Sequence, residues 1–178
     1  MRVLVFGNIN SGKSFAIAKM KRLFPHYDVI SIDDMRRRYG DGSLEGEELA
    51  RKMFVHEAKK AKDAFIETTG VGWAAFFLLE ELEPRSFIII YIAEGPDICI
   101  ERISAKDFSA TPYPWPDESK EGAIRNIDAQ FKSGMLKRLW KDRALDIIEV
   151  NNESELLSIP FAHYDDLIQN GKKRNKEM

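Results

Sequence analysis

The amino-acid sequence predicts an α/β fold, in which helices cover both faces of one parallel β-sheet. Five short apolar segments alternate with amphipathic helical patterns, and no internal repeat is visible. The segment Ser86–Ile92 is a continuous apolar run, which is typical of a central strand buried on both faces. Because 178 residues suit one domain with a substantial core, we expect a single domain over residues 1–170.

Each expected strand is short, apolar and rich in β-branched residues. The first leads straight into a glycine-containing loop, and Gly70 and Gly72 end the third. The expected strands are Arg2–Phe6, Asp28–Ile32, Ala64–Thr68, Ser86–Ile92 and Ala144–Val150.

Five helices are expected between these strands, and proline marks several of their ends. Pro25 closes the first helix, Pro84 stops the third, and Pro96 opens the fourth at its first helical position. The first helix is expected to bury a broad apolar face that contains Phe15, Ile17, Ala18 and Leu23. The expected ranges are Lys13–Leu23, Glu45–Lys62, Trp73–Leu82, Pro96–Lys106 and Glu118–Lys141.

Polar and proline-rich stretches are expected outside these elements. Tyr39–Ser43 is a turn-rich loop, and Asp107–Pro116 carries three prolines. The polar, basic segment Gly171–Met178 is expected to be a disordered tail.

Composition and charge exclude several classes of protein. With 27 Lys and Arg against 29 Asp and Glu, the formal charge is −2, which argues against a protein that coats nucleic acid but leaves room for a local basic groove. The single Cys99 excludes an intramolecular disulfide, and we expect it to be a small buried apolar residue. No signal peptide precedes the first strand, and no apolar run approaches the roughly 18 residues of a membrane span. We therefore expect a cytoplasmic protein with no membrane partner.

The loop after the first strand carries the most specific motif. Residues 7–14 read Gly-x-x-x-x-Gly-Lys-Ser between a strand and a helix, which is the context of a P-loop. Such a loop turns backbone N–H groups toward phosphate oxygens, while its lysine reaches the β- and γ-phosphates and its serine offers a hydroxyl to Mg²⁺. The sequence therefore predicts a P-loop NTPase fold with sheet order 2-3-1-4-5, and ATP and Mg²⁺ as cofactors. The expected nucleotide-binding residues are Gly7, Asn8, Asn10, Ser11, Gly12, Lys13 and Ser14.

The end of the second strand carries two carboxylates and three arginines. Asp33 is a candidate base for the proton of an attacking hydroxyl, or a holder of Mg²⁺ through water. Asp34 and Arg36 are candidate contacts to the acceptor, because an arginine fork suits an anionic group. The alternative is a helix start, with Asp33 or Asp34 as N-cap and Arg36, Arg37 and Arg38 on a solvated face.

The end of the third strand carries Glu67. This carboxylate could orient a Mg²⁺-bound water or the acceptor, although P-loop NTPases usually have an aspartate there. Turn and capping roles for Thr68 and Thr69 are the alternative account of this segment.

The fourth helix leads into a candidate lid at about residues 102–117. Arg102 and Lys106 are four residues apart, so they share one helix face and could close over the transferring phosphate. A solvated helix face is the alternative. Asn151 and Asn152, after the fifth strand, are a positional candidate for the adenine site.

Three features of the sequence together resemble the polynucleotide 5′-hydroxyl kinase group of small P-loop kinases: the P-loop, the block Ile32-Asp33-Asp34-Met35-Arg36, and the pair of Arg102 and Lys106. Zeta-toxin-like and gluconate-kinase-like proteins are near relatives of this group. The resemblance implies that Asp33 is the general base and that Arg36 contacts a phosphate of the acceptor. It also implies catalytic lid arginines at positions 102 and 106, where Lys106 is a departure.

The predicted function is that of an ATP-dependent phosphotransferase acting on a hydroxyl. Lys13, Asp33, Arg102 and Lys106 are its expected catalytic residues. The preferred acceptor is a nucleic-acid 5′-end, a nucleoside or a nucleotide. A small-metabolite kinase and a nucleotide-dependent switch or NTPase are the alternatives.

Overall fold

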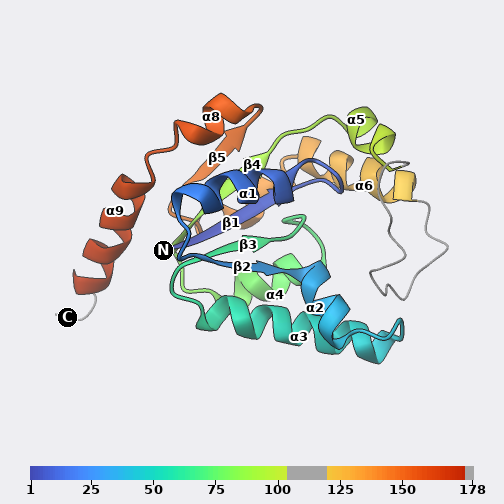
Figure 1. Ribbon diagram of the computed structural model, residues 1–178, viewed down its shortest axis with the longest axis horizontal. Coiled ribbons are helices and arrows are strands. Elements are labelled where there is room, and N and C mark those ends of the chain that lie inside the picture. The colour runs from blue at the N-terminus through green and yellow to red at the C-terminus, as the bar shows by residue number, and fades with distance from the viewer. Residues whose placement is uncertain (104–119, 175–178) are drawn as a thin grey trace.

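The computed structural model describes residues 1–103 and 120–174. Within these residues, five strands form one parallel sheet in the order β2-β3-β1-β4-β5, so the expected fold class and strand order are confirmed (Figure 1). The strands agree with expectation to within one residue, except that β5 begins at Ile147 instead of Ala144. They are β1 (Arg2–Gly7), β2 (Asp28–Ser31), β3 (Ala64–Glu67), β4 (Phe87–Ile92) and β5 (Ile147–Val150).

The described helices lie on both faces of the sheet, as Figure 1 shows for α1 on one side and α3 with α4 on the other. No helix in the described ranges is long and apolar enough to cross a membrane. The helices are α1 (Lys13–Leu23), α2 (Ile32–Tyr39), α3 (Leu44–Lys60), α4 (Trp73–Glu81), α5 (Pro96–Glu101), α6 (Lys120–Lys132), α7 (Met135–Trp140), α8 (Glu153–Leu157) and α9 (Phe161–Arg174).

The central strand β1 contributes side chains to two separate cores, because successive side chains of a strand point to opposite faces of the sheet. Leu4 and Phe6 pack in the cluster that contains residues of α2, α3, α4 and α7. Val3 and Val5 pack in the cluster that contains residues of α1, α8 and α9. The two cores hold the carboxyl ends of β1, β2 and β3 at one edge of the sheet.

The expected apolar face of the first helix is wrong in part. Phe15 and Leu23 are 60% and 56% exposed, and Ala18 is exposed as well. The buried side is formed instead by Ile17 with Ala16 and Met20. The buried residues of this helix form a narrow stripe at positions 13, 16, 17 and 20. Phe15, Ala18 and Leu23 lie outside this stripe and therefore face solvent.

Two helix boundaries also differ from expectation. The long helix expected over Glu118–Lys141 is two helices, because Gly134 adopts a left-handed conformation (φ 76°) between α6 and α7. The helix that begins at Pro96 ends at Glu101, and both Lys106 and the proline-rich stretch Asp107–Pro116 lie outside the described residues.

The C-terminal region contains two helices that were not expected. α8 has Asn152 as its N-cap, and α9 extends to Arg174, into the segment Gly171–Met178 that was expected to be a tail. Phe161 and Ile168 of α9 are buried in the second core, and this tertiary contact stabilises the helix.

Candidate active site

The P-loop backbone is curled tightly between β1 and α1. Gly7 (φ 154°) approaches β4 so closely that a Cβ there would lie 2.8 Å from the carbonyl oxygen of Ile92 and 2.6 Å from Ser11 Oγ. Gly12 adopts a left-handed conformation (φ 97°) directly before α1. A side chain at the first position would clash and one at the second would be strained, so the two glycines of the motif are required by the fold.

The side chains of the two P-loop asparagines anchor the loop to neighbouring helices. Asn8 Nδ2 donates to the carbonyl of Ile124 in α6 at 2.9 Å, and Asn8 Oδ1 accepts from Ile9 N at 2.8 Å. Asn10 Nδ2 donates to the carbonyl of Cys99 in α5 at 3.3 Å. The asparagine side chains thus serve the loop conformation, which leaves their backbone amides as the candidate phosphate contacts.

The P-loop lysine lies against the loop itself. Lys13 is buried, and its Nζ donates to the carbonyl oxygen of Asn8 at 2.7 Å. This places the ammonium beside the backbone that a P-loop wraps around phosphates.

The hydroxyl of Ser14 meets the carboxylate that ends β3. Ser14 Oγ donates to Glu67 Oε1 at 2.8 Å. The pairing follows from the sheet, because β1 and β3 are neighbours and Val5 is in register with Glu67. An alcohol oxygen and a carboxylate oxygen from two elements fit Mg²⁺, which prefers oxygen ligands and completes its shell with water and substrate phosphates.

The carboxylate of Asp33 lies in the first turn of α2, after the edge strand β2. Ser31 is the N-cap, and its Oγ accepts from the backbone amides of Asp33 and Asp34 at 3.2 and 3.4 Å. The suggested capping role of the two aspartates is therefore wrong. Asp33 is 47% exposed and accepts from Arg36 Nη1 at 2.8 Å. Because Ser31 is in register with Glu67, β2 and β3 end at the same edge of the sheet. Asp33, two residues after Ser31, therefore lies at the edge that carries the Ser14–Glu67 pair.

Arg36 is held by a carboxylate that sequence reasoning missed. Glu47 of α3 accepts from Arg36 Nε and Nη2, both at 2.8 Å, and also from Arg51 Nε at 2.7 Å. The Glu47 side chain is only 2% exposed. Burial raises the pKa of Glu47, but the hydrogen bonds and charges of Arg36 and Arg51 outweigh burial and hold that pKa below its ordinary value.

A signal for Glu47 was present in the sequence. Glu47 shares the buried stripe of α3 with Ala50, Phe54 and Ala58, and an ionisable residue on such a stripe needs a partner. The partner, Arg36, could be named only once the packing of α2 on α3 was known.

The remaining basic and acidic candidates of α2 lie on its exposed side. Asp34 pairs with Arg37, and Arg38 is exposed, as the alternative of a solvated face predicts for the two arginines. Asn151 and Asn152, the positional candidates for adenine, both contact Glu155, and Asn152 Oδ1 caps α8 by accepting from Glu155 N at 3.0 Å.

Arg102 lies beside the P-loop. At the end of α5, its Nη1 donates to the carbonyl oxygen of Asn10 at 2.9 Å and its Nη2 donates to Glu94 Oε2 at 2.9 Å. The structure thus brings Arg102 to the phosphate-binding loop, while Lys106, its expected partner, is outside the described residues.

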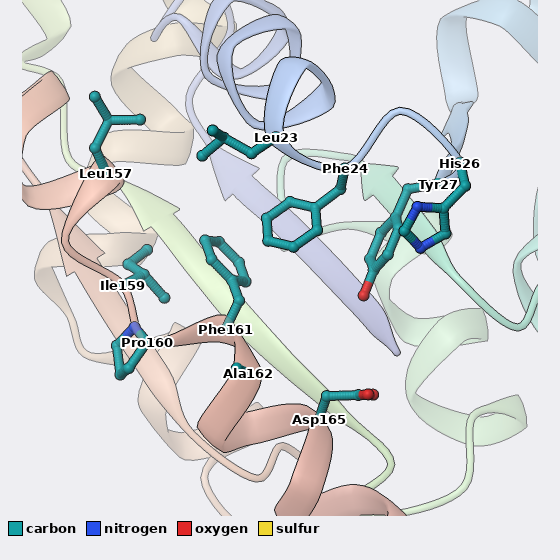
Figure 2. Close-up of a pocket in the computed structure, with 10 residues that line it drawn as sticks. All are labelled: Leu23, Phe24, His26, Tyr27, Leu157, Ile159, Pro160, Phe161, Ala162 and Asp165. Carbon is teal, nitrogen blue, oxygen red and sulfur yellow. The ribbon is translucent and has the colours of Figure 1, made fainter.

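A pocket of about 430 Å³ lies elsewhere, between the end of α1 and the chain that joins α8 to α9 (Figure 2). Its lining includes Phe24, Tyr27, Phe161 and Asp165. The P-loop lies at the start of α1 and this pocket at its end, about 16 Å apart for 11 residues of helix. The pocket is therefore separate from the candidate active site.

Comparisons with known proteins show the fold. No protein-family model and no curated protein matches the chain. Solved structures do match. A shikimate kinase from Acinetobacter baumannii in complex with shikimate is 14% identical, with 97% of this chain and 93% of that chain covered and a TM-score of 0.56. A gluconokinase from Sinorhizobium meliloti 1021 is 14% identical, with 97% and 96% covered and a TM-score of 0.55. The chain therefore shares the fold of these two solved kinases.

On this fold, the predicted residues form two groups. Lys13, Ser14 and Glu67 gather at the ends of β1 and β3, and Asp33 and Arg36 pair after the neighbouring β2. The likeness extends over the whole chain but at low identity, so membership of the polynucleotide kinase and zeta-toxin group stays a prediction.

Proposed function

We propose that this protein is an ATP-dependent kinase that transfers the γ-phosphate to a hydroxyl group of a small metabolite. The observation that carries the proposal is the contact of Ser14 Oγ with Glu67 Oε1 at 2.8 Å, at the same sheet edge as the half-exposed carboxylate of Asp33. The first pair suits the metal that accompanies a triphosphate. The second group suits removal of a proton from an acceptor.

The phosphate-binding groups are the P-loop amides and Lys13. Ser14 and Glu67 would hold Mg²⁺, which neutralises phosphate charge when it is bound. The side chains of Asn8 and Asn10 keep the loop in a shape that presents its amides. This part of the site positions the donor and needs no covalent chemistry from the protein.

Asp33 is the proposed base. As the acceptor oxygen forms its bond to the γ-phosphorus, its proton passes to the Asp33 carboxylate, and the bond to the bridging oxygen of ADP breaks. Arg36 holds that carboxylate through Nη1 while Glu47 holds Arg36 through Nε and Nη2. We therefore assign Arg36 primarily to orienting Asp33. This replaces the expectation that its main role is to clamp a phosphate of the acceptor.

A small acceptor is favoured over a long nucleic acid. The structurally similar proteins named above are kinases of shikimate and gluconate, and they match over nearly their full lengths. The formal charge of −2 gives no general attraction to a polyanion.

A second candidate acceptor carries a nucleobase: a nucleoside, a nucleotide or a nucleic-acid 5′-end. The observation in its favour is an aromatic group on α4, the helix that follows β3. Trp73 is 66% exposed, and Phe76 and Phe77 are also exposed. The rings of Trp73 and Phe77 lie 6.3 Å apart. Exposed aromatic rings next to a catalytic edge can stack on bases.

The test is ATP turnover with Mg²⁺ and a panel of acceptors. Sugar acids and cyclic polyols represent the first proposal, and nucleosides and an oligonucleotide with a free 5′-hydroxyl represent the second. Stimulation by one class, with a phosphorylated product, identifies the acceptor. ADP release at a rate that no acceptor changes would refute the kinase and favour an NTPase or switch.

A further inference from the structure

The end of α5 is joined to Asn10, at the apex of the P-loop, by two hydrogen bonds that run in opposite directions. Asn10 Nδ2 donates to the carbonyl of Cys99 at 3.3 Å, and Arg102 Nη1 donates to the carbonyl of Asn10 at 2.9 Å. Asn10 itself has a positive φ of 58°, in the left-handed region that asparagine adopts more readily than most non-glycine residues. The loop apex and the end of α5 therefore form one unit.

Glu94 completes this unit from the end of β4. Its Oε2 accepts from Arg102 Nη2 at 2.9 Å, and its Oε1 accepts from the backbone amide of Gly95 at 3.2 Å. The Glu94 side chain is 24% exposed and that of Arg102 is 45% exposed. Glu94 is thus tied to the start of α5 and Arg102 to its end, and the carboxylate spans the two.

The guanidinium of Arg102 is oriented by two acceptors, Asn10 O and Glu94 Oε2. Both bonds lie along the N–H directions of a planar group, so together they set the plane of the guanidinium as well as its place. With only one of them, the long side chain would regain several rotamers. An arginine that is already held beside a phosphate-binding loop binds an anionic ligand more tightly than a mobile one, because less side-chain entropy is lost on binding.

We propose that Glu94 is a positioning residue for the donor nucleotide, which acts by holding Arg102 against the P-loop apex. This inference rests on the proposed function in one respect, namely that ATP is the nucleotide that the P-loop binds. Glu94 contributes no attraction of its own, since a carboxylate repels phosphate. Its whole benefit to nucleotide affinity therefore passes through Arg102.

The test is a double-mutant cycle on the dissociation constant of ATP, measured by titration with Mg²⁺ and without acceptor. Glu94→Ala should weaken ATP binding about threefold to tenfold, the range for losing the net contribution of one ordinary hydrogen bond, since both side chains are partly exposed. In the Arg102→Ala background, the same substitution should cause no further weakening. Glu48→Ala, which removes the exposed ion pair of Glu48 with Lys52 on α3, is the matched control and should leave the dissociation constant unchanged.

The opposite results would overturn the proposal. One such result is that Glu94→Ala binds ATP as tightly as the wild type or more tightly. The other is that Glu94→Ala weakens ATP binding by the same factor in the wild-type and the Arg102→Ala backgrounds. Thermal unfolding checks each variant, and Glu94→Gln replaces Glu94→Ala if the latter does not fold. Because the cycle needs no acceptor, it stands apart from the phosphotransfer assay. An enzyme that binds ATP but phosphorylates nothing would refute the proposed function and leave the role of Glu94 intact.

Discussion

Replacing Glu47 with alanine is expected to destabilise the protein and to slow phosphotransfer. The carboxylate accepts three charge-assisted hydrogen bonds, two from Arg36 and one from Arg51, at 2.7–2.8 Å. Its removal leaves two guanidinium groups that are only 15% and 18% exposed without their main partner. Breaking such a buried pair costs about 3–5 kcal/mol, and the lower end applies here because both arginines can still reach water.

The size of the kinetic effect follows from the link between Glu47 and the proposed base. Without Glu47, Arg36 loses the two hydrogen bonds that hold its Nε and Nη2 and keeps the one from Nη1 to Asp33, so the two side chains can shift together. A displacement of about 1 Å at a reacting group costs on the order of 100-fold in rate. We therefore expect turnover to fall by about that factor while ATP affinity changes little.

The assay is urea denaturation of the wild-type protein, Glu47→Ala and the control Glu48→Ala. The last removes an exposed ion pair next to the buried one and should cost about 0.5 kcal/mol or less. A Glu47→Ala protein within about 0.5 kcal/mol of wild type would refute the reasoning, because a buried carboxylate with these partners must then contribute nothing.

The pH dependence provides a second check on the same residue. The folded state holds the pKa of Glu47 below its ordinary value, so the stabilisation is present above the unfolded pKa of about 4.3 and is lost as the pH falls through the folded pKa. The stability difference between wild type and Glu47→Gln should therefore shrink at acidic pH. A difference that stays constant from neutral to acidic pH would contradict the assignment.

Three further predictions follow from the site and its supports. Asp33→Ala should lower turnover about 10²–10⁴-fold, as loss of a general base does, with ATP binding nearly unchanged; undiminished phosphotransfer would exclude Asp33 as the base. Glu67→Gln should raise the Mg²⁺ concentration needed for half-maximal activity, because it replaces the carboxylate that Ser14 contacts; a titration with an unaltered midpoint would remove Glu67 from the metal site. Gly70→Ala should destabilise the fold by about 1–3 kcal/mol in urea, because Gly70 has a φ of 82° and a Cβ there would lie 2.5 Å from the ring of Phe6; wild-type stability would show that the loop can move aside.

The P-loop and the order of the elements could be predicted because their signals are local. The apolar run of β4 and the Gly-x-x-x-x-Gly-Lys-Ser motif depend on neighbouring residues alone, and the edge at which the strand ends meet follows from parallel pairing. Asp33 and Glu67 could be singled out for the same reason, since Glu67 is the last residue of β3 and Asp33 comes two residues after the end of β2.

The missed features depend on contacts between segments far apart in the chain. α9 packs on the sheet through Phe161 and Ile168, which are buried in the second core among residues far from them in the sequence. The exposed face of α1 was assigned wrongly because apolar residues such as Phe15 need not be buried, and only packing shows which stripe meets the sheet.

The sequence by itself determined that the chain is an α/β protein with a phosphate-binding loop, because glycine, lysine and serine at those spacings have one physical use in that context. Only the tertiary structure decided what the other charged residues do. Arg36 is 11 positions from Glu47, and Arg102 is 92 positions from Asn10, and no local pattern connects either pair. A charge on a helix has no long-range partner until the helix is packed, and packing is what pairs Arg36 with Glu47 and joins Arg102 to the P-loop.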